Sequence, residues 1–117
     1  MINQILDDLV ASINGAQAVI FMDGDGEEIA QCGEAALDIK LVGAWKEIQL
    51  DQIRAIAERL KLGNIHAVLF SLDEGNELLV PVSEGYCLLL FLSAYANIQE
   101  AMGKLKNAVM QLKKDIE

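Results

Sequence analysis

Hydrophobic residues near the N-terminus recur every three or four positions, which is the period of an amphipathic helix. They are Ile2, Ile5, Leu6, Leu9, Val10 and Ile13. The pair Asn14-Gly15 follows them, and glycine readily adopts the left-handed conformation common at helix C-termini. The pattern therefore predicts a first helix of about 12 residues that ends at this pair.

A β-hairpin is predicted after this helix. Residues 16–22 are apolar apart from Gln17, which is typical of a buried strand. Residues 23–26 read Asp-Gly-Asp-Gly, and residues 27–31 then alternate weakly between apolar and polar. Because Asp-Gly pairs accept the positive φ angles of tight hairpin turns, we expect the two segments to pair as antiparallel strands.

A long middle helix is predicted from Asp38, which can cap it, towards Leu62, and Gly63-Asn64 ends it. Its residues at helical spacing form one mainly apolar stripe, which we expect to face the core. The stripe consists of Val42, Trp45, Ile48, Gln49, Ile53, Ile56, Ala57 and Leu60.

Three closely spaced strands follow, over residues 65–72, 77–82 and 86–93. Their connections are short, so neighbouring strands are expected to be antiparallel. Pro81 has no backbone N–H to donate, which places it at a bulge, a strand end or a sheet edge.

The pattern becomes helical again after Asn97 and continues to the C-terminus. The apolar positions of this last helix are Ile98, Ala101, Met102, Leu105, Ala108, Val109, Leu112 and Ile116. The predicted order is therefore α-β-β-α-β-β-β-α, in a single α+β domain that spans residues 1–117.

The composition is unusually apolar for so charged a chain. Hydrophobic residues other than glycine make up 53% of it and the net charge is −9, whereas ordinary soluble domains reach ~45–50% with glycine included. The longest apolar run, residues 86–92, is far shorter than the ~17–25 residues of a spanning helix, and the N-terminus lacks the features of a secretory signal. Cys32 and Cys87 are predicted to be small core hydrophobes of a reduced, cytoplasmic protein.

Charge is unevenly distributed along the chain. Residues 1–39 carry eight acids and no base, whereas residues 40–61, in the middle helix, carry five bases and three acids. A nucleic-acid ligand would require a stronger basic patch, so we predict no nucleic-acid partner and no insertion into a membrane. Residues 104–117 are also weakly basic, with four bases and two acids. We expect the middle helix to be the surface that meets a partner.

No motif supports catalysis or a cofactor. Asp23, Asp25 and Glu27 fall at positions 1, 3 and 5 of a calcium loop, but Glu28 replaces the glycine required at position 6, so a solvated acidic turn is favoured. His66 is the only histidine, threonine is absent, and no serine lies in a Gly-x-Ser-x-Gly setting. We therefore predict neither catalytic nor metal-binding residues, no cofactor, and a protein that is not an enzyme.

Three segments together resemble the roadblock (dynein light chain, roadblock/LAMTOR) family, in the form of its bacterial gliding-motility regulators. They are the hairpin Gly-Ala-Gln-Ala-Val-Ile-Phe-Met-Asp-Gly-Asp-Gly-Glu-Glu-Ile-Ala at residues 15–30, the strands at 77–82 and 85–91, and Ala-Tyr-Ala-Asn-Ile at 94–98 before the last helix. The resemblance spans the chain, with the same element order. It implies a five-stranded antiparallel sheet, with the first and last helices on one face and the middle helix on the other.

The resemblance also implies a homodimer, because members of the family associate through the middle helix and the third strand. The segment at residues 65–72 would then lie at the dimer interface, and it lacks the Lys or Pro that protects an exposed sheet edge. The alternative is an interior strand of a monomer. The interface residues predicted in this way are Ile65, His66, Ala67, Val68, Leu69 and Phe70.

Roadblock proteins bind and regulate small Ras-like GTPases or act as scaffolds in larger assemblies, so the resemblance implies a GTPase partner and, in its bacterial form, a GTPase-activating protein. The partner-binding residues predicted on the middle helix are Asp51, Arg54, Ala55, Glu58, Arg59 and Lys61. The alternative for these charges is a solvated helix with i,i+4 pairs such as Arg54–Glu58. We expect any activation to position the GTPase's own residues and not to insert an arginine.

Two other functions remain open at this point. A sheet flanked by helices can enclose a pocket, so a small-ligand sensory domain of PAS- or profilin-like construction is one alternative, and it requires an internal cavity. A structural subunit of a larger assembly is the other.

Overall fold

The computed structural model describes residues 1–34 and 38–116. The elements, in chain order, are α1 (Ile2–Ser12), β1 (Ala16–Asp23), β2 (Glu28–Gly33), α2 (Ile39–Arg59), β3 (Val68–Leu72), β4 (Gly75–Ser83), β5 (Tyr86–Leu92) and α3 (Ile98–Ile116). This α-β-β-α-β-β-β-α order is the one that the sequence predicted.

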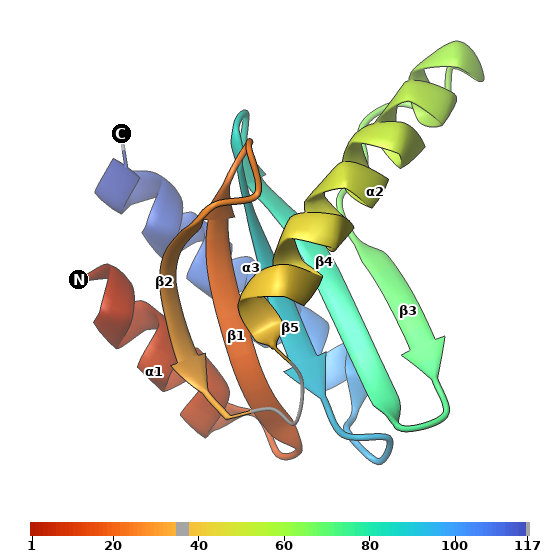
Figure 1. The fold of residues 1–117 in the computed structure, drawn as a ribbon. Coiled ribbons are helices and arrows are strands. Elements are labelled where there is room, and N and C mark those ends of the chain that lie inside the picture. Colours follow the sequence, from red (N-terminus) through yellow and green to blue (C-terminus); the bar gives the residue numbers. More distant parts are fainter. Residues whose placement is uncertain (35–37, 117) are drawn as a thin grey trace.

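The five strands form one sheet in the order β2-β1-β5-β4-β3, and every neighbouring pair is antiparallel. Helices α1 and α3 cover one face and α2 crosses the other (Figure 1). The central strands are covered on both faces, so residues 87–92 of β5 are all buried. The predicted α+β architecture is confirmed.

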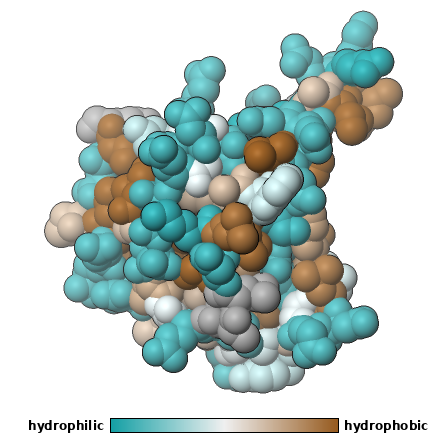
Figure 2. All heavy atoms as spheres, in the orientation of Figure 1, coloured by the Kyte–Doolittle hydropathy of each residue, from teal (hydrophilic) through white to brown (hydrophobic). Residues whose placement is uncertain are grey.

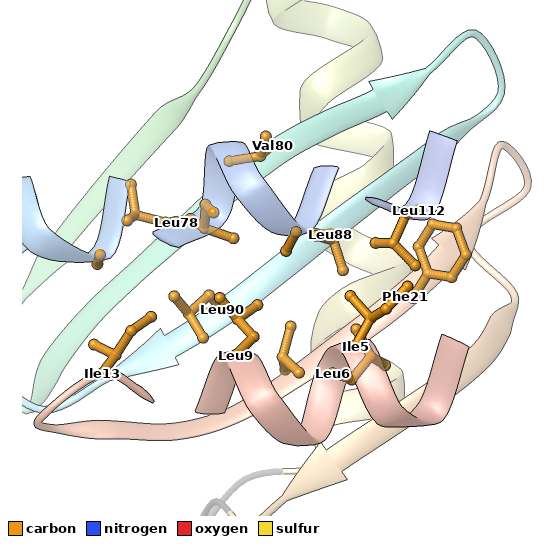
Figure 3. Packing of buried hydrophobic residues seen from close by; sticks show 14 of the residues in the cluster. Ile5, Leu6, Leu9, Ile13, Phe21, Leu78, Val80, Leu88, Leu90 and Leu112 are labelled. Atoms are coloured by element: carbon orange, nitrogen blue, oxygen red, sulfur yellow. The ribbon is translucent and has the colours of Figure 1, made fainter. Parts of the chain in front are cut away.

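The larger core lies between the sheet and the helices α1 and α3. Figure 3 shows Leu6 and Leu9 of α1 and Leu112 of α3 directed at Phe21, Leu88 and Leu90 of the sheet. All six side chains are at most 4% exposed. At roughly 1.5–3 kcal/mol for each fully buried aliphatic or aromatic side chain, this layer supplies most of the hydrophobic stabilisation.

A smaller core lies under α2, where Leu50 and Ile39 contact the opposite side chains of the central strands. Gly43 brings the helix close to β1: a Cβ atom at this position would lie 2.6 Å from Met22 Sδ. After Leu50 the only buried residue of α2 is Ala57. The C-terminal part of α2 extends beyond the sheet, at the upper right of Figure 1.

Caps and turns follow the sequence signals. The Asp38 carboxylate accepts a hydrogen bond from the Leu41 N–H (3.2 Å), and the Asn97 side chain accepts one from Glu100 N–H (3.0 Å). In the first hairpin, Asp23 Oδ1 accepts hydrogen bonds from the backbone N–H groups of Asp25 and Glu27. The acidic turn is thus closed by its own side chain, as is usual for Asx turns.

Strand β3 corrects one predicted boundary. It begins at Val68, so Ile65, His66 and Ala67, which the sequence placed in a strand at the dimer interface, precede it. The chain has to return from the overhanging end of α2, turning at Lys61 and Gly63 with positive φ angles, and it reaches the sheet only at Val68.

The direction of the α2 stripe is a second correction. The sequence predicted that Trp45, Ile48, Ile56 and Leu60 face the core, but these side chains are 48–63% exposed. The residues that face the sheet are Ile39, Gly43, Glu47, Leu50 and Ala57.

Among the described residues, no helix is long and apolar enough to cross a membrane.

Candidate interaction surfaces

The outer edge of β3 is one half of a candidate interaction surface. β3 is the last strand of the sheet and pairs only with β4. Its side chains include Leu69 and Leu72, which are 45% and 53% exposed, and neither Lys nor Pro lies within it. A free edge of this kind is an aggregation hazard unless another chain covers it.

One flank of α2 is the other half. Val42, Trp45, Gln49, Ile53, Ile56 and Leu60 recur at intervals of three or four residues. In a helix of 3.6 residues per turn this line is roughly a quarter turn from the buried line through Gly43, Leu50 and Ala57. The flank is therefore a separate apolar surface, and the sequence pattern found its residues but not its direction.

Lys46 shows which way this flank faces. Its ammonium nitrogen lies 3.7 Å from the centre of the Phe70 ring on β3 and 3.5 Å from Glu77 Oε1 on β4. Lys46 projects from the same side of α2 as the apolar flank, so the flank opens towards the β3 edge. We call the α2 flank and the β3 edge together the seam. Figure 2 shows hydrophobic residues along α2, at its end and at the right-hand edge of the molecule.

A small group of charges is buried between α2 and the sheet. Glu47 and Glu77 are both 6% exposed. Burial, followed by the nearby Asp51 carboxylate, raises the pKa of Glu47 above its ordinary value. Glu77 Oε1 has no hydrogen-bond partner, so its contact with Lys46 is ionic only.

The six predicted partner-binding residues lie on the sides of α2 and its C-terminal end away from the apolar flank. Five are exposed: Asp51, Ala55, Glu58, Arg59 and Lys61. Arg54 is half-buried, and its Nη1 lies 3.7 Å from Asp51 Oδ1, so the ion pair is i,i+3 and not the i,i+4 pair with Glu58. Leu41 and Ile48 lie on the same side of α2 as Ala55 and Arg59, and they are exposed apolar residues that the charge pattern did not reveal.

The cysteines are not poised for chemistry. Burial raises the pKa of the Cys87 thiol to about 12. Burial, together with a hydrogen bond to the Asp7 carboxylate and its charge, raises the pKa of Cys32 to about 11. Both are free thiols. Since the thiolate is the reactive form, neither side chain has the depressed pKa of a nucleophile.

A metal site or an enclosed pocket would indicate other functions than the binding of a protein partner. Among residues 1–34 and 38–116, no group of three or more His, Cys, Asp or Glu side chains could hold a metal ion. An open groove of about 1560 Å³ lies beside the end of α2. It is not the internal cavity that the small-ligand alternative requires.

Several solved structures share this architecture. A roadblock/LC7 domain from Streptomyces avermitilis has a TM-score of 0.90 at 15% identity, over 97% of this chain and 96% of that chain. MglB from Myxococcus xanthus has a TM-score of 0.88 at 16% identity, over 98% and 94%. MglC from Myxococcus xanthus has a TM-score of 0.68 at 29% identity, over 98% and 99%.

No protein-family model matches the sequence, and the search of curated proteins found no match. The evidence from other proteins is therefore structural. It agrees with the element order, the sheet topology and the two-plus-one arrangement of helices described above. The chain has the fold of the roadblock/LC7 domains and is similar to MglB, as the resemblance of its sequence to the roadblock family implied.

Proposed function

We propose that the chain is a homodimeric, non-catalytic regulator or adaptor that binds a small Ras-like GTPase in the cytoplasm. The observation that carries this proposal is the seam, in which an unpaired strand edge and an apolar helix flank lie side by side. A second copy would pair β3 with β3 and pack α2 against α2, as the family resemblance implies. Both halves of the seam would then be buried by one two-fold contact.

The seam is suited to association mainly through its exposed hydrophobic residues, and less through its charged ones. Trp45, Ile56 and Leu60 are 62%, 55% and 63% exposed. Aromatic and large aliphatic residues of this kind form the centres of stable interfaces, and exposed patches of them are uncommon on monomers. Lys46 and Phe70 hold α2 and β3 together, so the two halves present one fixed surface.

The GTPase part of the proposal is supported by the family resemblance and by the structural likeness to MglB and MglC. The exposed charged side of α2, with Asp51, Ala55 and Arg59, is left free by a dimer at the seam. We assign this side to the GTPase. Stimulation of hydrolysis, if present, would position the GTPase's own catalytic groups.

The oligomeric state tests the seam. Light scattering at micromolar concentration is expected to give twice the 12.8 kDa mass of the chain. Ile56→Lys on the flank and Leu69→Lys on the edge are each expected to give a monomer. Ile29→Lys is the matched control, because Ile29 is a 42% exposed residue on β2 at the opposite edge of the sheet. A monomeric wild-type mass, or a dimer that both seam variants retain, would overturn this assignment.

The GTPase assignment needs its own experiment. The dimer is immobilised and exposed to host lysate loaded with GDP or with a non-hydrolysable GTP analogue, and captured proteins are identified by mass spectrometry. We expect one Ras-like GTPase, bound preferentially in one nucleotide state. With the purified GTPase, Arg59→Glu is expected to weaken binding, whereas Arg54→Ala and Arg59→Ala leave stimulated hydrolysis in place. Capture of no GTPase by a dimeric protein would reject this part alone.

A further inference from the structure

Strand β4 is longer than its neighbour on one side. β3 pairs with β4 only from Gly75 to Leu79, whereas β4 continues to Ser83. The last four residues of β4 therefore have no strand beside them on the β3 side, because the chain there turns away towards the end of α2. The missing strand leaves an open groove.

This groove lies between the end of β4, helix α3 and the chain around the end of α2. Its lining includes the apolar side chains Val80, Val82, Met102, Leu105, Val109 and Met110. Met110 is 61% exposed, although it lies on a helix whose other face is fully packed. Val80, Val82 and Leu105 are buried and form the floor of the groove, whereas Met102, Val109 and Met110 are its accessible apolar part. Accessible apolar side chains of this kind are the ones that a partner can cover.

The charges around the groove are opposite in sign to those of the rest of the molecule. Its cationic side chains are Arg54, Lys61, Lys106 and Lys113, with His66 beside them. Only two acids, Glu58 and Glu84, line it. In a chain with a net charge of −9 this is a local excess of positive charge, and it favours an acidic partner.

The size of the groove and the backbone of β4 further limit the kind of partner that can bind there. A groove of about 1560 Å³ exceeds the ~300–1,000 Å³ of a typical small-molecule site, so it fits a peptide segment better. An added β-strand would need backbone donors along β4, but Pro81 has none, and the strand is irregular between Pro81 and Ser83. An amphipathic helix needs no such donors, because its side chains fill the groove.

The groove can be occupied while the seam is also occupied. Arg54 lines the groove and Ile56 belongs to the seam, and two residues apart in a helix their side chains point about 160° away from each other. The same holds for Glu58 and Leu60. The two surfaces therefore lie on opposite sides of the end of α2.

The geometry points to a second interaction site: the groove between α3, the end of β4 and the end of α2 binds an acidic amphipathic helix of another protein. Apolar side chains of that helix would pack on Met102, Val109 and Met110, and its Asp and Glu residues would face Lys106 and Lys113. This site goes beyond the proposed dimer and GTPase contacts, and it does not depend on either.

Selection of helical peptides from a phage-displayed random library on the 117-residue chain tests the site. We expect selected peptides to carry Leu, Ile or Phe at i, i+3 or i+4 and i+7, with Asp and Glu enriched between them. Binding of a synthetic selected peptide is expected to fall about 10-fold with the pair Lys106→Glu and Lys113→Glu, because both changes replace an attractive surface contact with a repulsive one.

Matched variants keep this test specific. Lys104→Glu makes the same charge change on α3, two residues from Lys106, but Lys104 lies outside the groove, beside α1. It is expected to leave binding unchanged, as is the seam variant Ile56→Lys. Met110→Ala is expected to weaken binding without changing the melting temperature, because Met110 is exposed.

Other occupants give different results. Peptides without acidic enrichment, or binding that tolerates the Lys106 and Lys113 changes, would overturn the proposal. If these changes instead abolish self-association in light scattering, the occupant is a second copy of the chain. If they abolish cosedimentation with phosphatidylserine vesicles and no peptide is selected, the groove contacts a membrane surface.

Discussion

The ammonium nitrogen of Lys46 lies 3.7 Å from the centre of the Phe70 ring, so a cation–π contact joins α2 to the edge strand β3. The same nitrogen is the ionic partner of Glu77, whose side chain is 8% exposed. Lys46 thus holds the otherwise lightly packed α2 in place beside the sheet edge, and it compensates a buried carboxylate.

Removing one member of this pair is expected to cost more than removing both. Lys46→Met leaves Glu77 buried and uncompensated, and it should lower the free energy of unfolding by about 2 kcal/mol. The double variant Lys46→Met with Glu77→Leu should recover most of that loss, because no charge is then buried. Urea unfolding at fixed protein concentration measures both. If the double variant instead lost as much stability as Lys46→Met and Glu77→Leu lose separately, added together, the two residues would not be coupled.

Glu47 makes stability depend on pH. Because its pKa is raised in the folded state, the unfolded chain loses this proton at lower pH than the folded chain does. The contribution of Glu47 is therefore most favourable below its unfolded value, near 4.5, and it is lost as pH rises through the folded value. Glu47→Gln should raise the melting temperature at pH 7, and the gain should vanish below about pH 4.

Two helical glycines are expected to respond with opposite signs to alanine. At Gly103 on α3 nothing lies within 4 Å of an added Cβ atom, so Gly103→Ala should raise the free energy of unfolding by about 1 kcal/mol through helix propensity. At Gly43 the added atom would lie 2.6 Å from the Sδ of the fully buried Met22. Overpacking costs about 1–3 kcal/mol, so Gly43→Ala should be destabilising despite the same propensity gain. Equal stabilisation by both changes would show that α2 does not approach β1 this closely.

Local signals in the sequence predicted the element order, the Asp38 cap and the Asp-Gly hairpin, since each depends on residues close together in the chain. The direction of the α2 stripe could not be predicted in this way. Apolar spacing shows that Trp45, Ile56 and Leu60 share a flank, but not whether a core or another molecule covers it. Lys46 and Glu47 reinforced the error, because charged residues are assigned to the solvent side unless a buried partner is known.

The groove was missed for a different reason. Its lining comes from three segments that are distant in sequence, and it exists only because β3 starts at Val68. The pattern at residues 65–67 is as strand-like as that of the residues after them. The position at which a chain joins a sheet depends on where the preceding helix ends in space, and hydropathy does not contain that information.

In the proposed dimer, local unfolding of the overhanging end of α2 should depend on protein concentration. Over residues 52–60 only Ala57 is buried, and a helical segment of this length is marginal in water without a surface to pack on. In a dimer at the seam, a second copy would provide that surface. Amide hydrogens in these turns should then exchange rapidly in dilute solution and become protected as the concentration rises, while those of β1 and β5 stay protected throughout. The end of the helix would thus complete its folding as the protein associates.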